Sequence, residues 1–198
     1  MRDRLFFPLA FILASSFILM ALNPFSERVP SGPVSAGAGN AEDVTVKDRE
    51  LYRFQPGNYD SIRFIPASGE TPAAMQITRQ ATEDYQDPRS GPHLVFAEDI
   101  EFALQHRRIQ IDIEARGSGE FAASQFEANY FAKTEYETGW KPFDLTPEFK
   151  TYRFTFDTPQ RGETVGYDYL GIRPVAPDKH RMMEVRSVRV HALTAKKS

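Results

Sequence analysis

Hydrophobic and polar residues alternate with a period of two along most of the chain after residue 50. In RRIQIDIEAR, Ile109, Ile111 and Ile113 share one side and the polar residues between them share the other. The segment TYRFTF, residues 151–156, repeats the pattern with aromatic residues. Successive side chains of a strand point to opposite faces of a sheet, so this alternation predicts half-buried β-strands.

Segments of this kind recur throughout the second part of the chain, with joins rich in Gly, Pro, Asn and Asp. They are ELYRF, DSIRFIP, AAMQIT, PHLVFA, DIEFAL, RRIQIDIEAR, SQFEANYFAK, TYRFTFD, YDYLGIRP and MEVRSVRVHAL. Short strands at this spacing, without helices between them, predict an all-β antiparallel jelly-roll β-sandwich. We expect it to occupy residues 49–198, with Tyr152, Phe154, Phe156, Leu170 and Ile172 facing its core.

The first 25 residues have a different pattern, a continuous apolar run. From Leu5 to Leu22 there are 18 residues without a charge. At about 1.5 Å per residue, a helix of this length nearly spans a bilayer core of roughly 30 Å. Arg2 and Arg4 precede the run and favour a cytoplasmic N-terminus. We therefore expect a single-pass helix in the cell inner membrane, in contact with the lipid bilayer, and an exported domain, periplasmic or extracellular.

A cleaved signal peptide is the alternative for residues 1–25. Its apolar region would be about 7–15 residues long and soon followed by a small-x-small cleavage site. Here the run is longer, and Ala36, Ala38 and Ala41 come well after it. Residues 26–48 are rich in Pro, Gly, Ala and Ser and show no periodicity, which predicts a flexible linker.

Composition excludes several classes of function. The 198 residues carry 24 Lys and Arg against 27 Asp and Glu, a net charge of −3 without a basic block. Nucleic-acid binding is therefore not expected. The chain has no cysteine, which excludes disulfides, thiolate zinc sites and cysteine nucleophiles.

Candidate catalytic groups do not form a recognisable pattern. The four histidines, His93, His106, His180 and His191, lack metal-binding spacing, and no G-x-S-x-G segment is present. Asp112 and Glu127 are candidates for adjacent strands, but carboxylates on an outer sheet face usually only solvate it. We assign no catalytic residue and no metal ligand, and do not expect an enzyme.

The order of motifs in the second part of the chain resembles a known superfamily. IQIDIEARGSG, FEANYFAK, GWKPFDLTPEFKTYRFTF, DYLGIRP and VRSVRVHAL are similar to successive strands of jelly-roll carbohydrate-binding modules, the galactose-binding-like β-sandwiches. The resemblance covers about residues 50–193 and implies a non-catalytic glycan-binding module. In that superfamily the last strand often carries an acidic residue and an asparagine near a structural calcium. Here MMEVRSVRV offers only Glu184, so no cofactor is assigned.

Sugars are held by an aromatic plane, with amides, carboxylates or arginines bonding their hydroxyls. The candidates for this role are Asn129, Phe131, Trp140, Arg153, Tyr169 and Arg173. Trp140 alternatively closes one end of the sandwich. The arginines at positions 153, 173, 186 and 189 either solvate a sheet or form a basic patch suited to an acidic glycan or protein. The polar segment TEDYQDPRSGPHL, residues 82–94, is either a binding loop or a long surface turn.

Three functions follow from these observations. The first is a membrane-anchored, exported module that binds a glycan or polysaccharide. The alternative is a protein-interaction or accessory subunit of an envelope membrane complex, and the third is a small glycan-active enzyme. A glycan-binding module predicts an outward groove that contains Trp140, Phe131 or Tyr169. An accessory subunit predicts that these aromatics are buried and that an apolar patch lies elsewhere.

Overall fold

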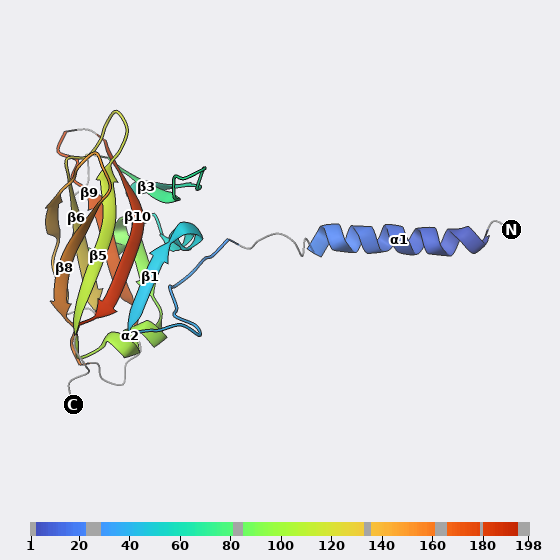
Figure 1. Ribbon diagram of the computed structural model, residues 1–198, viewed down its shortest axis with the longest axis horizontal. Helices are drawn as coiled ribbons and strands as arrows, with labels where there is room; N and C mark the ends of the chain where they lie inside the picture. The colour runs from blue at the N-terminus through green and yellow to red at the C-terminus, as the bar shows by residue number, and fades with distance from the viewer. Residues whose placement is uncertain are drawn as a thin grey trace.

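The computed structural model describes residues 3–22, 29–80, 85–132, 136–160, 166–178 and 180–193. Two antiparallel sheets pack face to face as a β-sandwich, with β8, β5, β10 and β1 in one layer and β6 and β9 in the other (Figure 1). The larger sheet has the order β2 (Asp60–Ile65), β3 (Ala74–Arg79), β10 (Arg181–Ala192), β5 (Arg108–Gly117) and β8 (Lys150–Asp157), and β1 (Asp43–Lys47) also pairs with β10. The smaller sheet has the order β4 (His93–Phe96), β9 (Asp168–Pro174), β6 (Gln125–Ala132) and β7 (Lys141–Asp144).

The alternating segments place their apolar side chains between the two layers. Ile109, Ile111 and Ile113 of β5 are fully buried, as are Leu170 and Ile172 of β9. In β8, Tyr152 is buried, whereas Phe154 and Phe156 are only half-buried and pack against the core. The reason is that β8 is the last strand of its sheet and part of its inner face lies at the margin of the sandwich.

Two segments predicted as strands are helical. DIEFAL lies in α2 (Glu98–Leu104), at the end of the sandwich where β10 ends (Figure 1). Ile100 and Leu104 are four residues apart, so a helix buries both on one side, and its acidic first turn suits a helix N-terminus. ELYRF lies largely in η1 (Asp48–Arg53), a 3-10 helix that buries Leu51. A second 3-10 helix, η2, covers Pro88–Ser90.

The N-terminal part contains one long helix, α1 (Asp3–Leu22). Among the residues that the structure describes, no helix has both the length and the apolar content for crossing a membrane. The membrane anchor expected from the sequence stays a prediction.

The structure differs from the expected flexible linker over residues 31–47. The Val34 side chain is buried, and its backbone bonds with Val95 and Ala97 beside β4. Residues 43–47 form β1, which pairs along its whole length with β10. The alternating valines Val44 and Val46 explain this, because both are buried in the core. The folded unit therefore begins before the expected boundary at residue 49.

The described part of the polar segment, residues 85–94, crosses the outer face of the smaller sheet and then enters β4. Tyr85 is buried, and its hydroxyl donates to Asp60 Oδ2 at 2.5 Å. Pro88 packs on Gly171 of β9, where an added Cβ would lie 2.7 Å from the Pro88 Cβ. Glycine is therefore needed at position 171 for this loop to lie close to the sheet.

Burial raises the pKa of the Asp60 carboxyl, and the hydrogen bond from Tyr85 offsets this rise only in part. Burial and the adjacent Asp60 also raise the pKa of Tyr85 far above its ordinary value. The pair thus consists of a neutral phenol that donates to a partly desolvated carboxyl group.

We predict that Ile111→Ala lowers the free energy of unfolding by about 2–5 kcal/mol, because it leaves a cavity among fully buried side chains. Urea unfolding of the full-length protein in detergent, followed by circular dichroism, measures the change. Thr151→Ala, at an exposed position of the neighbouring β8, is the control and should shift stability by no more than about 0.5 kcal/mol. Equal shifts for both variants would contradict the assignment of β5 to the core.

We also predict that Asp60→Asn changes the pH dependence of stability. A raised folded pKa means that the folded state keeps a proton which the unfolded chain has already released, so stability falls as pH rises through that window. The introduced amide oxygen would still accept from Tyr85 but would not titrate. Relative to the parent protein, Asp60→Asn should gain stability as the pH rises above about 4, the ordinary aspartate pKa, because the penalty for ionising Asp60 develops on that side. Urea titrations at each pH test this.

Tyr85→Phe is the companion variant, because it removes the donor to Asp60 and should make the loss of stability toward neutral pH steeper. Parallel pH profiles for the parent protein and for both variants would show that Asp60 does not titrate as described.

Candidate functional site

Five of the six predicted ligand-binding residues lie on the outer face of the smaller sheet or beside it. β6 and β9 are neighbours, and their outward residues face one another in three pairs. These pairs are Glu127 with Arg173, Asn129 with Gly171, and Phe131 with Tyr169. Trp140 precedes β7 and reaches the same face, since a Cβ at Gly171 would lie 2.9 Å from its Cη2 atom.

Arg153 lies away from this group, on β8 of the larger sheet. Its Nε atom donates to Asp112 Oδ1 at 2.7 Å. The nearby Arg189 pairs with Asp43 at 2.6 Å, and Arg186 with Glu114 at 3.2 Å. Hydrogen bonds from Arg189 hold the pKa of Asp43 below its usual value. Because each of these guanidinium groups has a carboxylate partner on an adjacent strand, they do not form the basic patch that the sequence left open.

Arg173 is buried, and its guanidinium group contacts a carboxylate, a backbone carbonyl and two aromatic rings. It forms an ion pair with Glu127 at 2.8 Å, and its Nη1 atom donates to the carbonyl of Tyr85. Its guanidinium lies 3.9 Å from the centre of the Trp140 ring and 4.8 Å from that of Tyr85. Arg173 therefore holds the covering loop and Trp140 on the sheet, and its role is to position them.

Trp140 is half-buried, and its indole Nε1 donates to the carbonyl of Gln86 at 3.0 Å. Tyr85 contacts it edge-on, with ring centres 6.0 Å apart. The side chain thus closes one end of the covered face while part of its ring stays exposed to solvent. Both expectations for Trp140, packing and exposure, are met in part.

Asn129 is also buried, and its amide has two partners. Its Nδ2 atom donates to Glu137 Oε2 at 2.7 Å, and its Oδ1 atom accepts from Thr138 Oγ1 at 3.2 Å. Asn129 therefore positions the exposed carboxylate of Glu137 at the border of the face. Sequence reasoning missed Glu137, which lies three residues before Trp140 in the same segment.

Phe131 and Tyr169 form a half-exposed pair of rings, with centres 6.2 Å apart and planes at 61°. The guanidinium of Arg89 lies 5.6 Å from the centre of the Tyr169 ring and donates to both carboxylate oxygens of Asp87. Hydrogen bonds from Arg89 lower the pKa of Asp87. His93 packs behind Tyr169, and burial lowers its pKa, so it is neutral near pH 7.

We call Phe131, Trp140 and Tyr169, with Arg89 and Glu137 at their edge, the aromatic strip. Its rings offer flat apolar surface, and its border offers hydrogen-bond donors and acceptors. That combination suits the C–H faces and hydroxyl groups of a sugar. Arg89 gave no separate signal in the sequence, although it lies within the polar segment that was considered as a binding loop.

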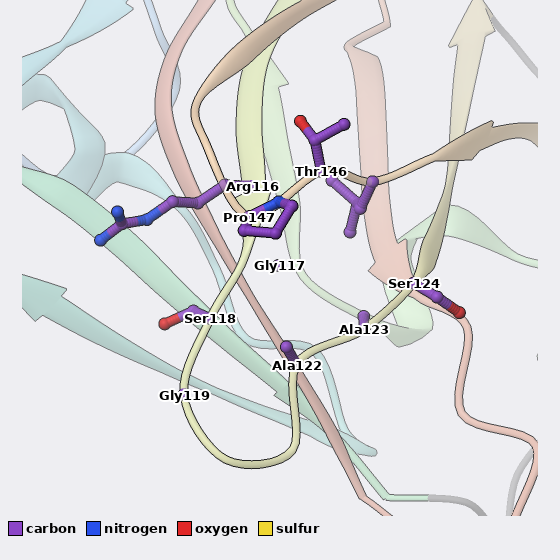
Figure 2. Close-up of a pocket in the computed structure, with 10 residues that line it drawn as sticks. Arg116, Gly117, Ser118, Gly119, Ala122, Ala123, Ser124, Thr146 and Pro147 are labelled. Atoms are coloured by element: carbon purple, nitrogen blue, oxygen red, sulfur yellow. The ribbon is translucent and has the colours of Figure 1, made fainter.

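A cavity of about 620 Å³ lies at one end of the sandwich, and none of the predicted ligand-binding residues lines it (Figure 2). Residues 116–119, 122–124 and 145–147 line it. In Figure 2, the tips of Arg116 and Ser118 project to one side and that of Ser124 to the other. Because the polar groups do not converge, the cavity lacks the arrangement that orients a ligand.

Arg116 and Ser118 instead bond to Glu184, the acidic residue of the last strand. Arg116 Nη2 donates to Glu184 Oε2 at 2.8 Å, and Ser118 Oγ donates to Oε1 at 2.6 Å. A guanidinium group thus neutralises this buried carboxylate. Within the described ranges, no cluster of three or more His, Asp or Glu side chains is arranged to hold a metal ion.

A comparison of the sequence with protein-family models and with curated proteins finds no match. Solved structures with a similar fold do exist. The tandem CBM22-1–CBM22-2 domain of Xyn10C from Paenibacillus barcinonensis has a TM-score of 0.52 at 8% identity, over 73% of this chain and 42% of its own. The chain thus spans less than half of that tandem.

Two further structures are similar over much of the chain. The CBM22-1 xylan-binding domain of the same Xyn10C has a TM-score of 0.50 at 7% identity, over 72% of this chain and 86% of its own. The arabinose-bound α-L-arabinofuranosidase MgGH51 has a TM-score of 0.54 at 9% identity, over 86% of this chain and 31% of its own. These likenesses confirm the fold that the sequence motifs implied: the chain is a jelly-roll β-sandwich of the kind found in carbohydrate-binding modules.

Proposed function

We propose that this protein is a non-catalytic glycan-binding module and that its ligand lies along the aromatic strip. The observation that carries the proposal is the half-exposed ring pair of Phe131 and Tyr169, bordered by Arg89 and Glu137. The similarity in fold to a xylan-binding domain supports it.

The charges of the face favour a neutral glycan. Arg89 is paired with Asp87, and Arg173 with Glu127. Glu137 adds an exposed carboxylate at the border. An acidic polysaccharide would meet no unpaired cation among these residues and one exposed negative charge, so repulsion would oppose it.

No reaction is assigned to the strip. Glycoside hydrolysis needs two carboxyl groups, one of which stays protonated near neutral pH. Here Glu127, Glu137 and Asp87 each accept from a fixed partner, and the pKa of Asp87 is lowered. The raised pKa of Asp60 belongs to a carboxyl group tied to Tyr85, and this pair holds the covering loop.

We further propose that residues 5–22 anchor the protein in the inner membrane and that the sandwich is exported. The uncharged run from Leu5 to Leu22 and the arginines before it support this placement. Such a protein would hold a polysaccharide close to the membrane surface.

The first test is binding of the full-length protein, in detergent, to a panel of neutral and acidic polysaccharides by affinity electrophoresis. We expect a neutral polysaccharide to retard it. Tyr169→Ala should weaken binding about tenfold, because the loss of one stacking contact is worth about 1.4 kcal/mol. Tyr52→Ala is the matched control, since Tyr52 is 38% exposed and lies in η1 against Phe64 of the larger sheet, away from the strip. Equal loss in both variants, or binding to no polysaccharide, would refute the proposed function.

The second test uses the fluorescence of Trp140, the single tryptophan of the chain. Because its ring is half-buried against Arg173, acrylamide should quench it to an intermediate degree. A bound neutral polysaccharide should reduce this quenching and shift the emission. Emission that is fully shielded and unchanged by any polysaccharide that binds would place the ligand away from the strip.

A further inference from the structure

A smaller hollow, of about 280 Å³, lies between η1 and the region where β2 and β3 are joined. Its wall is mainly apolar and includes Val29, Tyr52, Phe64, Pro66 and Ala67. Val29 is 53% exposed and Tyr52 is 38% exposed, so apolar surface continues around its mouth. We call these five residues the apolar hollow.

Local backbone geometry holds Tyr52 in this place. Asp48 has a φ of 52°, in the left-handed region that few residues other than glycine adopt, and it turns the chain from β1 into η1. The next turn buries Leu51 and leaves Tyr52 facing outward. Tyr52 then stacks on Phe64 of β2, with ring centres 3.9 Å apart. The exposed aromatic pair is thus fixed by backbone and ring contacts.

The chain that leads to the hollow is fixed as well. Arg53 donates from Nη1 to the carbonyls of Ser31 and Pro33 at 3.0 and 2.9 Å, while Glu50 holds its Nε atom. From Ser31 onward the backbone therefore lies against the sandwich. Val29, two residues earlier, already forms part of the hollow.

The connection between this point and α1 is short. α1 ends at Leu22, so six residues, 23–28, separate it from Val29. Even a fully extended chain of that length spans no more than about 25 Å. If residues 5–22 lie in the bilayer, the apolar hollow stays within that distance of the membrane surface.

We infer that the apolar hollow is a membrane-contact surface that rests on the interfacial region of the bilayer; this rests on the membrane anchor proposed above. Tyrosine suits that region, because its ring enters the apolar side while its hydroxyl stays in water. Asp48 and Arg49, which also line the hollow, carry opposite charges. Zwitterionic lipid therefore suffices for the contact, and anionic lipid is not required.

The test places an indole at the hollow of the full-length protein in phosphatidylcholine liposomes. Tyr52→Trp combined with Trp140→Phe leaves a single indole, and lipids brominated at a series of acyl-chain depths quench it on close approach. Lipids brominated near the headgroup should quench the indole at position 52 at least about twofold more strongly than they quench a control indole that faces water. The reason is that aromatic side chains prefer this layer of the bilayer. Tyr136→Trp in the same Trp140→Phe background is that matched control, because Tyr136 is 49% exposed and precedes β7 of the smaller sheet.

Flotation of the same liposomes after alkaline carbonate washing shows separately whether the N-terminal segment is inserted in the bilayer. Protein that floats, with position 52 quenched more than position 136, supports the contact. Protein that floats with equal quenching at the two positions overturns the contact and leaves the anchor standing. Protein that does not float overturns the anchor and the contact with it. The polysaccharide experiments are unaffected by any of these results.

Discussion

The buried guanidinium of Arg173 is the interaction on which the outer face of the smaller sheet depends. It joins Glu127 on the neighbouring strand, the carbonyl of Tyr85 in the covering loop and the ring of Trp140. A buried charge is tolerated only when its hydrogen bonds and its ion pair are complete, and loss of one partner typically costs about 3–5 kcal/mol. The loop and the tryptophan are therefore held on the sheet by the need to satisfy one cation.

The two outer faces of the sandwich differ in how their polar and charged side chains are arranged. On the larger sheet, carboxylates of one strand pair with guanidinium groups of the adjacent strand, and these paired charges cancel. These pairs are Asp43 with Arg189, Asp112 with Arg153, Glu114 with Arg186, and Glu184 with Arg116. On the smaller sheet, a loop buries the polar residues and leaves aromatic rings at its border. Only the second arrangement offers a ligand apolar surface together with polar groups.

Period-two alternation predicted the long strands because each buries one face. It failed at DIEFAL, where Ile100 and Leu104 also fit a helix and Phe102 is 67% exposed. The alternation of side chains along β9 likewise predicted that Tyr169 and Arg173 share a face. It did not reveal that Arg153 belongs to the other sheet, because the sheet that a strand joins is set by topology. The burial of Arg173 depends on the covering loop, whose path is set by contacts distant in sequence.

The pairing of β1 with β10 has a practical consequence for shortened forms of the chain. β10 is an interior strand, flanked by β5 on one side and by β3 and then β1 on the other. A protein that starts at residue 49 would lack β1, and residues 187–191 of β10 would then present unpaired backbone groups in the middle of a sheet. Such an edge recruits strands from other molecules, so this truncation would leave the sandwich prone to aggregation.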